Sequence, residues 1–270
     1  MRTSPIATVA VGIATCATAL LTLVGFAQTA RAQYNPEFAG ESDIDPRVTE
    51  VYVDVPVVEA SAKTGGAPAD AIVLFDGTDL SAWRNLRGDA AHWTVADGAM
   101  TVKPGAVPYP PGGDLLTRDS FENFQLHLEF RTPAIVVGEG QGRGNSGVFL
   151  QERYEVQILD NYDNPTYSNG QVGSVYKQTP PLANASRPPG TWQTYDIVYT
   201  APVFSESGAL LHPAYVTVLH NGVLVQNHTA VQGPTNYRGR GIYRPHGPLP
   251  IKLQDHGNPM SFRNIWLREL

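Results

Sequence analysis

Residues 248–257 read Pro-Leu-Pro-Ile-Lys-Leu-Gln-Asp-His-Gly, and apolar and polar side chains alternate from Ile251 to His256. A period of two is typical of a β-strand with one face in the core. Ile251 and Leu253 fall on one face, and the opposite face carries Lys252, Gln254 and His256. A cation, an amide and an imidazole in a row suit a binding cleft better than a plain solvated surface.

A second stretch shows the same alternation. Residues 154–160 read Tyr-Glu-Val-Gln-Ile-Leu-Asp, with Glu155 and Gln157 opposite Val156 and Ile158. This pattern also predicts a strand with one apolar and one polar face. We expect the polar faces of the two strands to line one site.

Strand-like segments recur at short spacing from residue 71 onward, and no window of helical length keeps a 3.6-residue period. The 26 Gly and 22 Pro also interrupt the chain too often for long helices. Asn221-Gly222 and Asp97-Gly98 are signals of type I′ hairpins. The sequence therefore predicts one all-β domain of about 200 residues, a two-sheet antiparallel β-sandwich of the jelly-roll type. The expected strands are 72–75, 92–95, 99–102, 124–131, 147–151, 154–159, 194–199, 215–220, 223–226, 251–254 and 262–267.

The N-terminal residues are typical of a secretory signal peptide. Arg2 precedes an apolar run from Ile6 to Phe26, and Ala30-Arg31-Ala32 forms an A-x-A cleavage site. A retained N-terminal anchor is the alternative. Cleavage after this site would leave an exported protein, periplasmic or extracellular. The expected divisions are a signal peptide (1–32), an extension or linker (33–70) and the sandwich domain (71–270).

The mature chain has no cysteine, because Cys16 lies in the signal peptide. Its stability must then come from its core rather than from disulfides. Losing Arg2 and Arg31 takes two positive charges from a net charge of −6, which leaves −8. The mature chain has no basic cluster, which argues against nucleic acid and anionic membranes as partners. No second long apolar run follows the signal peptide, so we expect no membrane span in the mature protein.

The polar face of residues 154–160 limits the chemistry. Laminarinase-type glucanases have this sandwich shape and carry three acidic residues at alternate positions of one strand. Here those positions hold Glu155, Gln157 and Leu159, and Asp160 is out of phase unless a bulge redirects it. Retaining hydrolysis of an ordinary glycoside needs two carboxyl groups about 5–5.5 Å apart. An ordinary two-carboxylate glucanase is therefore disfavoured.

Several further motifs lie between the strands. Residues 75–83 read Phe-Asp-Gly-Thr-Asp-Leu-Ser-Ala-Trp, 144–149 read Gly-Asn-Ser-Gly-Val-Phe, 188–192 read Pro-Pro-Gly-Thr-Trp, and 262–265 read Phe-Arg-Asn-Ile. Together with 154–160 and 253–257, they resemble the 3-keto-disaccharide hydrolase domain family, over about Ile72 to Leu270 and in the family's order. The resemblance implies a concanavalin- or laminin-G-like jelly roll and a carbohydrate substrate, a glycoside already oxidised at C3 of the sugar. It also implies cleavage by hydrolysis or 1,2-elimination, and some members are metal-dependent.

This chemistry suits a cleft with one carboxylate. A ketone at C3 acidifies the C2 proton, so one base can remove it and the C1 leaving group departs from an enolate. The base is expected to be His256 or Glu155, and the group near the enolate oxygen Lys252, Arg143 or a divalent cation. The catalytic candidates are thus His256, Glu155 and Lys252. The substrate-binding candidates are Gln157, Gln254, Arg143, Asn145, Tyr176 and Trp192.

Other interpretations stay open. No close spacing of His, Asp and Glu specifies a metal site, so the cofactor and the metal are undetermined. Glu155 has a structural alternative, an ion pair with Arg143 or Lys252. A secreted carbohydrate-binding module without turnover is the alternative function, and a lamin-G-like matrix protein is a weaker third.

Three aromatic residues are expected to have structural positions. The large apolar rings of Trp83 and Trp93 are expected in the core. His127 alternates with Glu129 and Arg131 on the outer side of a strand, which predicts a solvated face.

Overall fold

The computed structural model describes residue 47 and residues 50–104 and 113–270. The chain divides into two compact units, residues 1–56 and 57–270. In the first unit, Val51–Val55 is exposed and forms no strand, although its sequence favours one. The expected signal peptide lies outside the described residues.

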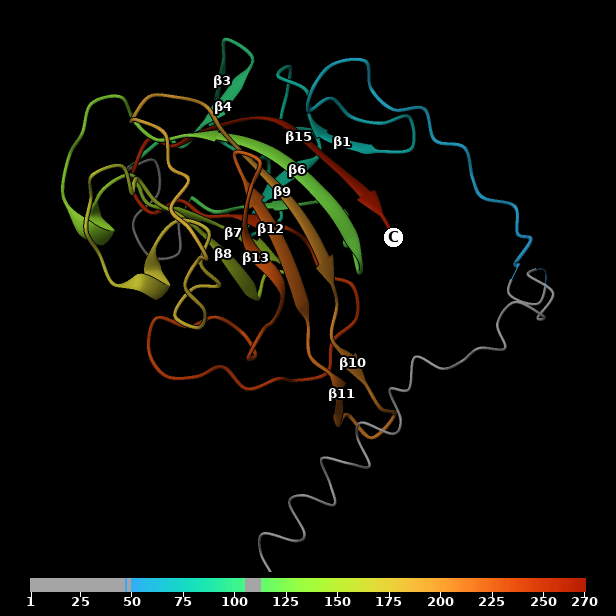
Figure 1. The fold of residues 1–270 in the computed structure, drawn as a ribbon. Helices are drawn as coiled ribbons and strands as arrows, with labels where there is room; N and C mark the ends of the chain where they lie inside the picture. The colour runs from blue at the N-terminus through green and yellow to red at the C-terminus, as the bar shows by residue number, and fades with distance from the viewer. Residues whose placement is uncertain (1–46, 48–49, 105–112) are drawn as a thin grey trace, which may run out of the picture. The chain divides into compact units, whose positions relative to one another are not determined.

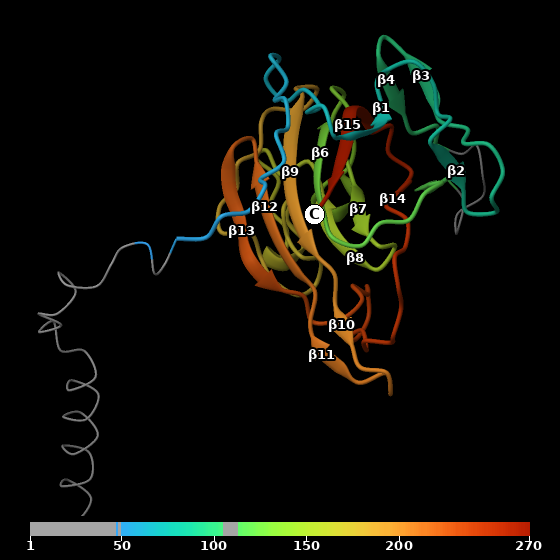
Figure 2. The same ribbon diagram turned by 90° about the vertical axis from the view of Figure 1, so that its right-hand side faces the viewer.

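The second unit is almost entirely β-structure (Figure 1). Its larger sheet has eight strands. Their order is β13 (Val223–Ala230), β12 (Tyr215–His220), β9 (Gln193–Thr200), β6 (Phe124–Arg131), β15 (Ser261–Glu269), β4 (Ala99–Thr101) and β3 (Thr94–Ala96), with β1 (Ile72–Phe75) also paired to β15. Figure 2 shows β13, β12, β9, β6 and β15 of this sheet side by side.

The smaller sheet has five strands, in the order β2 (Trp83–Asn85), β5 (Leu115–Thr117), β14 (Lys252–Leu253), β7 (Ser146–Leu150) and β8 (Tyr154–Ile158). A separate hairpin joins β10 (Val203–Phe204) to β11 (Leu210–His212). The described helices are two short 3₁₀ turns, η3 (Gly140–Gly142) and η4 (Ser168–Gly170), and neither could cross a membrane. The strand pairs of both sheets are antiparallel, which confirms the predicted all-β sandwich.

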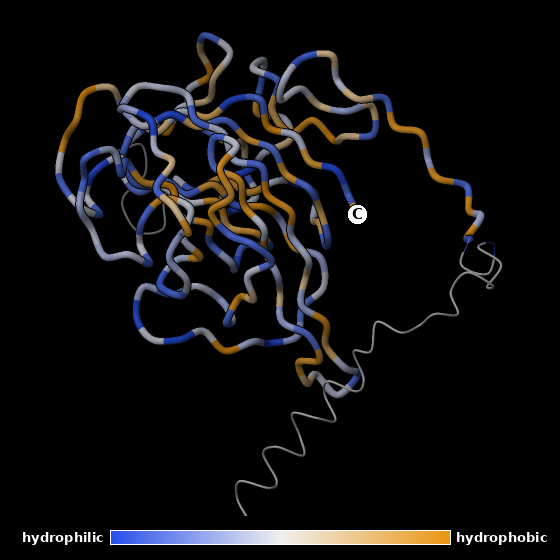
Figure 3. Tube along the Cα trace, viewed as in Figure 1, coloured by the Kyte–Doolittle hydropathy of each residue, from blue (hydrophilic) through white to orange (hydrophobic). Residues whose placement is uncertain are grey.

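The core forms because alternate side chains of each sheet point inward. On β9, Tyr195, Ile197 and Tyr199 are buried, while on β8 Val156 and Ile158 are buried in the same cluster. Figure 3 shows hydrophobic residues concentrated along the strands and hydrophilic residues in the loops.

The two expected tryptophans are in this core, and each indole N–H has a partner there. Trp83 Nε1 donates to the Leu74 carbonyl at 2.8 Å, and Trp93 Nε1 donates to the Gly113 carbonyl at 2.7 Å. Buried indole N–H groups need such acceptors. The prediction that both rings are core residues is confirmed.

Both predicted hairpin turns are present. Asn221 and Gly222 have φ values of 52° and 79°, and they join β12 to β13. Asp97 and Gly98 have φ values of 52° and 72° between β3 and β4. Two consecutive positive φ values define the type I′ turn, whose twist matches that of the strands.

The predicted solvated position of His127 is wrong. Its side chain is 3% exposed, Nδ1 lies 2.7 Å from Asp196 Oδ1, and its ring stacks on Trp266 at 5.2 Å between centroids. The residues just before β1 cover this face, because the Gly65 carbonyl accepts hydrogen bonds from Asn264 Nδ2 at 2.8 Å and Trp266 Nε1 at 3.0 Å. The segment that the sequence assigns to a linker thus packs on the larger sheet from about residue 57 onward.

This contact predicts that Gly65→Ala lowers stability by more than backbone strain alone. Gly65 has φ +71°, and an added Cβ would lie 3.2 Å from the His127 ring, which Asp196 and Trp266 hold in place. The matched control is Gly98→Ala, with φ +72° and no atom within 4 Å of the added Cβ. Each variant should lose about 1–2 kcal/mol from the left-handed backbone, and Gly65→Ala about 1 kcal/mol more. Urea unfolding measures both, and equal losses would contradict the contact.

Candidate functional site

A cleft of about 590 Å³ lies over the face of the smaller sheet that points away from the core. The floor comes from β7 and β8, and the walls come from the loops that follow β6, β8, β13 and β14. The lining residues are Gln141, Gly142, Asn145, Phe149, Glu155, Gln157, Tyr167, Tyr176, Lys177, Thr235, Tyr237, Gln254 and His256.

Strand register places the polar side chains of the floor. Phe149 on β7 pairs with Glu155 on β8 and with Lys252 on β14, so these three share one face. In the next row Gly147 pairs with Gln157, and the Gln254 N–H donates to the Gly147 carbonyl at 3.0 Å. Because Val156, Ile158 and Leu253 fill the opposite face, these polar residues are held toward the cleft.

The structure therefore brings together six of the residues that the sequence singles out. All of them line the one cleft, although they come from three separate parts of the chain: Asn145, Glu155, Gln157, Tyr176, Gln254 and His256.

Glu155 is the carboxyl group of this cleft. The residue is only 5% exposed, and this burial raises its pKa to about 8. Lys252 lowers the pKa and Asp114 raises it, and both effects are smaller than that of burial. The side chain lies across Gly147, where an added Cβ would come within 2.5 Å of Oε1. In the described part of the chain its carboxyl oxygens have no hydrogen-bond partner, and the side chain lines the cleft.

Gln157 lies beside Glu155 on the floor and is 1% exposed. Its Nε2 donates to Gln141 Oε1 at 3.1 Å, whereas its Oε1 is buried and has no partner among the described residues. A buried acceptor without a donor costs stability. A ligand hydroxyl in the cleft would supply the missing donor.

Aromatic rings from the loops after β8 and β13 form part of the wall. The hydroxyls of Tyr167 and Tyr176 are 2.9 Å apart, and burial is the main reason that the pKa of Tyr176 is raised well above its ordinary value. Tyr237 completes the group. Tyrosine rings with hydroxyl groups give a sugar both a stacking surface and hydrogen-bond partners.

The three remaining candidates do not line this cleft. Lys252 Nζ lies 3.3 Å from Asp114 Oδ2 and 3.7 Å from the centre of the Phe149 ring, next to the cleft rather than in it. Trp192 has the guanidinium groups of Arg131 and Arg263 over its ring, at 4.6 and 4.2 Å from the ring centre. Its ring thus packs against cations outside the cleft.

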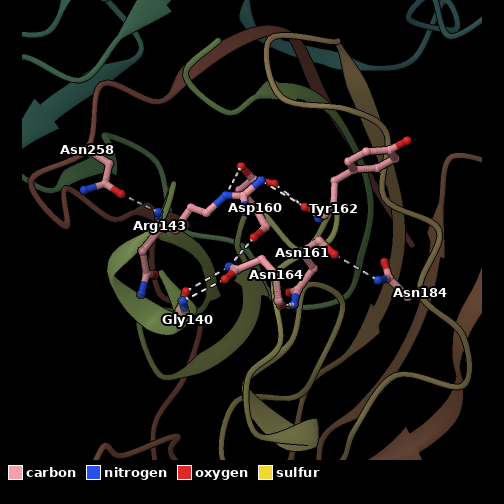
Figure 4. A network of polar contacts seen from close by, with 9 residues as sticks. Gly140, Arg143, Asp160, Asn161, Tyr162, Asn164, Asn184 and Asn258 are labelled. Atoms are coloured by element: carbon pink, nitrogen blue, oxygen red, sulfur yellow. Dashed lines mark hydrogen bonds and ion pairs between the residues drawn. The ribbon is translucent and has the colours of Figure 1, made fainter. Parts of the chain in front are cut away.

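Arg143 is the third. Its Nε donates to Asp160 Oδ2 at 2.7 Å and its Nη2 to the Tyr162 carbonyl at 2.9 Å, as Figure 4 shows. The side chain thus belongs to a polar network below a separate hollow of about 790 Å³. That hollow is larger than the cleft, but proline, glycine and aliphatic residues line most of it, and its Arg143–Asp160 pair neutralises itself.

Neither expected structural ion pair of Glu155 forms, since Arg143 and Lys252 bind Asp160 and Asp114 instead. No three His, Cys, Asp or Glu side chains of residues 50–104 and 113–270 come together as a metal site requires. No step of the proposal below is assigned to a metal ion.

The sequence did not single out Lys177, Tyr167, Tyr237, Thr235, Gln141 or Phe149, which also line the cleft. Most of them lie in loops without periodicity. The Tyr176-Lys177 pair within a stretch rich in Tyr, Asn and Gly is the one local signal that could have pointed to them.

The buried carboxyl group predicts a pH-dependent stability. Because the pKa of Glu155 is raised from 4.5 to about 8 by folding, its stabilising effect is complete below pH 4.5 and is lost as pH rises through 8. Relative to Glu155→Gln, the wild type should lose on the order of 3 kcal/mol of unfolding free energy between pH 5 and pH 8. Glu269→Gln, at an exposed position, is the control. Urea unfolding at both pH values measures this, and a difference independent of pH would contradict the buried carboxyl.

Comparison with known proteins places the chain in a family. The model of the 3-keto-alpha-glucoside-1,2-lyase-like domain matches residues 70–268. A 3-keto-disaccharide hydrolase of Bacteroides thetaiotaomicron is 26% identical over 251 residues, covering 75% of this chain and 80% of that protein.

Solved structures agree. A candidate glycosyl hydrolase of Parabacteroides distasonis is 51% identical, with a TM-score of 0.78 over 86% of this chain and 99% of that one. A second candidate glycosyl hydrolase of the same organism is 19% identical, with a TM-score of 0.52 over 79% and 100% of the two chains, and supports the fold alone. The chain therefore belongs to the family of 3-keto-alpha-glucoside-1,2-lyase-like domains.

Proposed function

We propose that this protein cleaves glycosides that carry a ketone at C3 of the sugar, by removing the C2 proton and releasing the C1 substituent. The observation that carries the proposal is the single buried carboxyl of Glu155, at the floor of a cleft lined with amides and tyrosines. Family membership and the 3-keto-disaccharide hydrolase relative support the substrate class.

The proposed reaction has two stages. A base takes the C2 proton, and the electron pair of the C–H bond moves toward the C3 oxygen to give an enolate. The enolate then expels the C1–O group, which leaves with the electron pair of that bond and gains a proton, and an enone remains. Addition of water at C1 and a proton at C2 gives net hydrolysis, whereas release of the enone gives net elimination.

Glu155 is proposed as the base for the C2 proton. A pKa of about 8 lies close to neutral pH, where a general base is most effective, because it combines basicity with a populated anionic form. Gly147 beneath it has no side chain, which leaves room for the carboxyl group.

The other polar groups have supporting roles. His256 faces the same cleft and is proposed to pass a proton to the leaving group. The unpartnered Oε1 of Gln157 and the amide of Gln254 are proposed to bind sugar hydroxyls.

The alternative is a carbohydrate-binding module that uses the same cleft without turnover. The pKa of Glu155 favours the enzyme, because binding neutral sugar hydroxyls does not need a carboxyl group buried at such a cost. Saturable binding of unmodified glycans, with no product from a 3-keto-glucoside, would decide for the module.

Turnover of a 3-keto-glucoside should depend on the ionised form of Glu155. We expect kcat/KM to rise with pH up to an apparent pKa of about 8 and then to level off. Glu155→Gln should reduce it by about 10²–10⁴, and Glu269→Gln should leave it unchanged. Release of the leaving group is the measurement. A wild-type rate that falls as pH rises from 6 to 8, or full activity of Glu155→Gln, would contradict this role.

A methyl group at residue 147 should displace the base without removing any polar group. The Cβ of Gly147→Ala would lie 2.5 Å from Glu155 Oε1, and the backbone at Gly147 is not in the left-handed region. We expect kcat/KM to fall by about 10- to 100-fold, the usual cost of a misplaced reacting group. Gly247→Ala adds the same methyl where no atom lies within 4 Å and should behave as the wild type. Equal activity of the two variants would show that the position of Glu155 is not critical.

A further inference from the structure

The ammonium group of Lys177 lies among three tyrosine rings at the wall of the cleft. Its Nζ is 3.9 Å from the ring centre of Tyr167, 5.3 Å from that of Tyr237 and 6.0 Å from that of Tyr176. Each ring face is negative and attracts a cation within about 6 Å. The rings thus hold a positive charge next to the space where a ligand would bind.

The backbone of Lys177 is also unusual. Its φ of +59° is in the left-handed region, which costs a residue with a side chain free energy. The conformation is fixed by the Lys177 N–H, which donates to the Asn169 carbonyl at 2.8 Å, and by the Tyr176 N–H, which donates to the Glu155 carbonyl at 3.1 Å. Strain of this kind is often kept at functional sites. Here it places Lys177 on the wall, one residue from the backbone contact to Glu155.

Lys177 differs from the two cations that the sequence favoured for the enolate. Lys252 is paired with Asp114, and Arg143 with Asp160, so the charge of each is already compensated. Lys177 faces the cleft and forms no ion pair with a carboxylate within the described chain. Because ring faces compensate a charge less completely than a carboxylate does, its field still acts on a ligand.

We infer that Lys177 is the group that stabilises the negative charge developing on the C3 oxygen of the sugar. This assignment rests on the proposed function. As the C2 proton passes to Glu155 and the electron pair moves to the C3 oxygen, the ammonium donates a hydrogen bond to that oxygen. The charge on the oxygen disappears when the C1–O bond breaks and the ketone re-forms. The lysine thus acts through its charge and its N–H donor and not as a nucleophile.

The kinetic test compares Lys177→Met with the wild type on a 3-keto-glucoside. We expect kcat to fall by about 10²–10³, the usual effect of removing one donor to a developing oxyanion, with KM raised by no more than about tenfold. Lys177→Arg keeps the charge and should recover part of kcat. Lys63→Met, at an exposed position, is the control. A wild-type kcat in Lys177→Met would overturn the inference, as would a loss confined to KM or explained by a lower melting temperature.

A binding test decides the inference separately from the proposed function. Calorimetry compares Glu155→Gln with the double variant Glu155→Gln, Lys177→Met, using a 3-keto-glucoside and its unoxidised parent. The second substitution should weaken ketosugar binding by about tenfold, the value of one charge-assisted hydrogen bond, and leave binding of the parent nearly unchanged. Equal ketosugar affinities would overturn the role of Lys177 whatever the turnover. Absence of wild-type turnover would instead contradict the proposed function.

Discussion

The packing of one face of strand β8 in the core determines which side chains line the cleft. Val156 and Ile158 enter the core between the sheets, so Glu155 and Gln157 must point to the other side. A shift of register by one residue would bury both polar groups in the core and expose the apolar ones. The position of the cleft, its carboxyl group and its unpartnered amide oxygen all follow from this packing.

The electrostatics of the site follow from the same burial. A carboxyl group that is removed from water prefers its protonated form, which raises the pKa of Glu155 toward the working range of a general base. Lys252 lowers that pKa only in part, because Asp114 is paired with it and itself raises the pKa of Glu155. Positive charge reaches the cleft from the loop after β8, where tyrosine rings hold Lys177. An acidic group and a cationic group thus both line the space proposed for a sugar.

Much of this could be predicted from local patterns. The alternation of apolar and polar residues predicted β6 and β12 with their observed bounds. Two Asx-Gly pairs predicted the two hairpin turns. The short strands β2 and β5 escaped prediction, because three residues are too few to show a period. The polar floor of the cleft was predictable from the same alternation, because its side chains lie between core residues on one strand and must point to the opposite face of the sheet.

The errors at individual residues come from contacts between distant parts of the chain. His127 has the alternation of a solvated position, but a segment some sixty residues earlier covers it. The sequence favoured Arg143 as a partner of the enolate, but in the folded protein Arg143 forms an ion pair with Asp160. Lys177 carries no periodic signal, and its role depends on rings from two loops. Charge compensation is a tertiary property, so the sequence could not show that both cations it favoured, Lys252 and Arg143, would be paired with carboxylates.

The central claim is that a base removes the C2 proton of a ketosugar in this cleft. The most direct test is the rate of leaving-group release from a 3-keto-glucoside with deuterium at C2, compared with the same compound with hydrogen there. We predict slower release from the deuterated compound under single-turnover conditions, and no release from the unoxidised parent glucoside. Equal rates for the two isotopes, together with cleavage of the parent glucoside, would contradict the account.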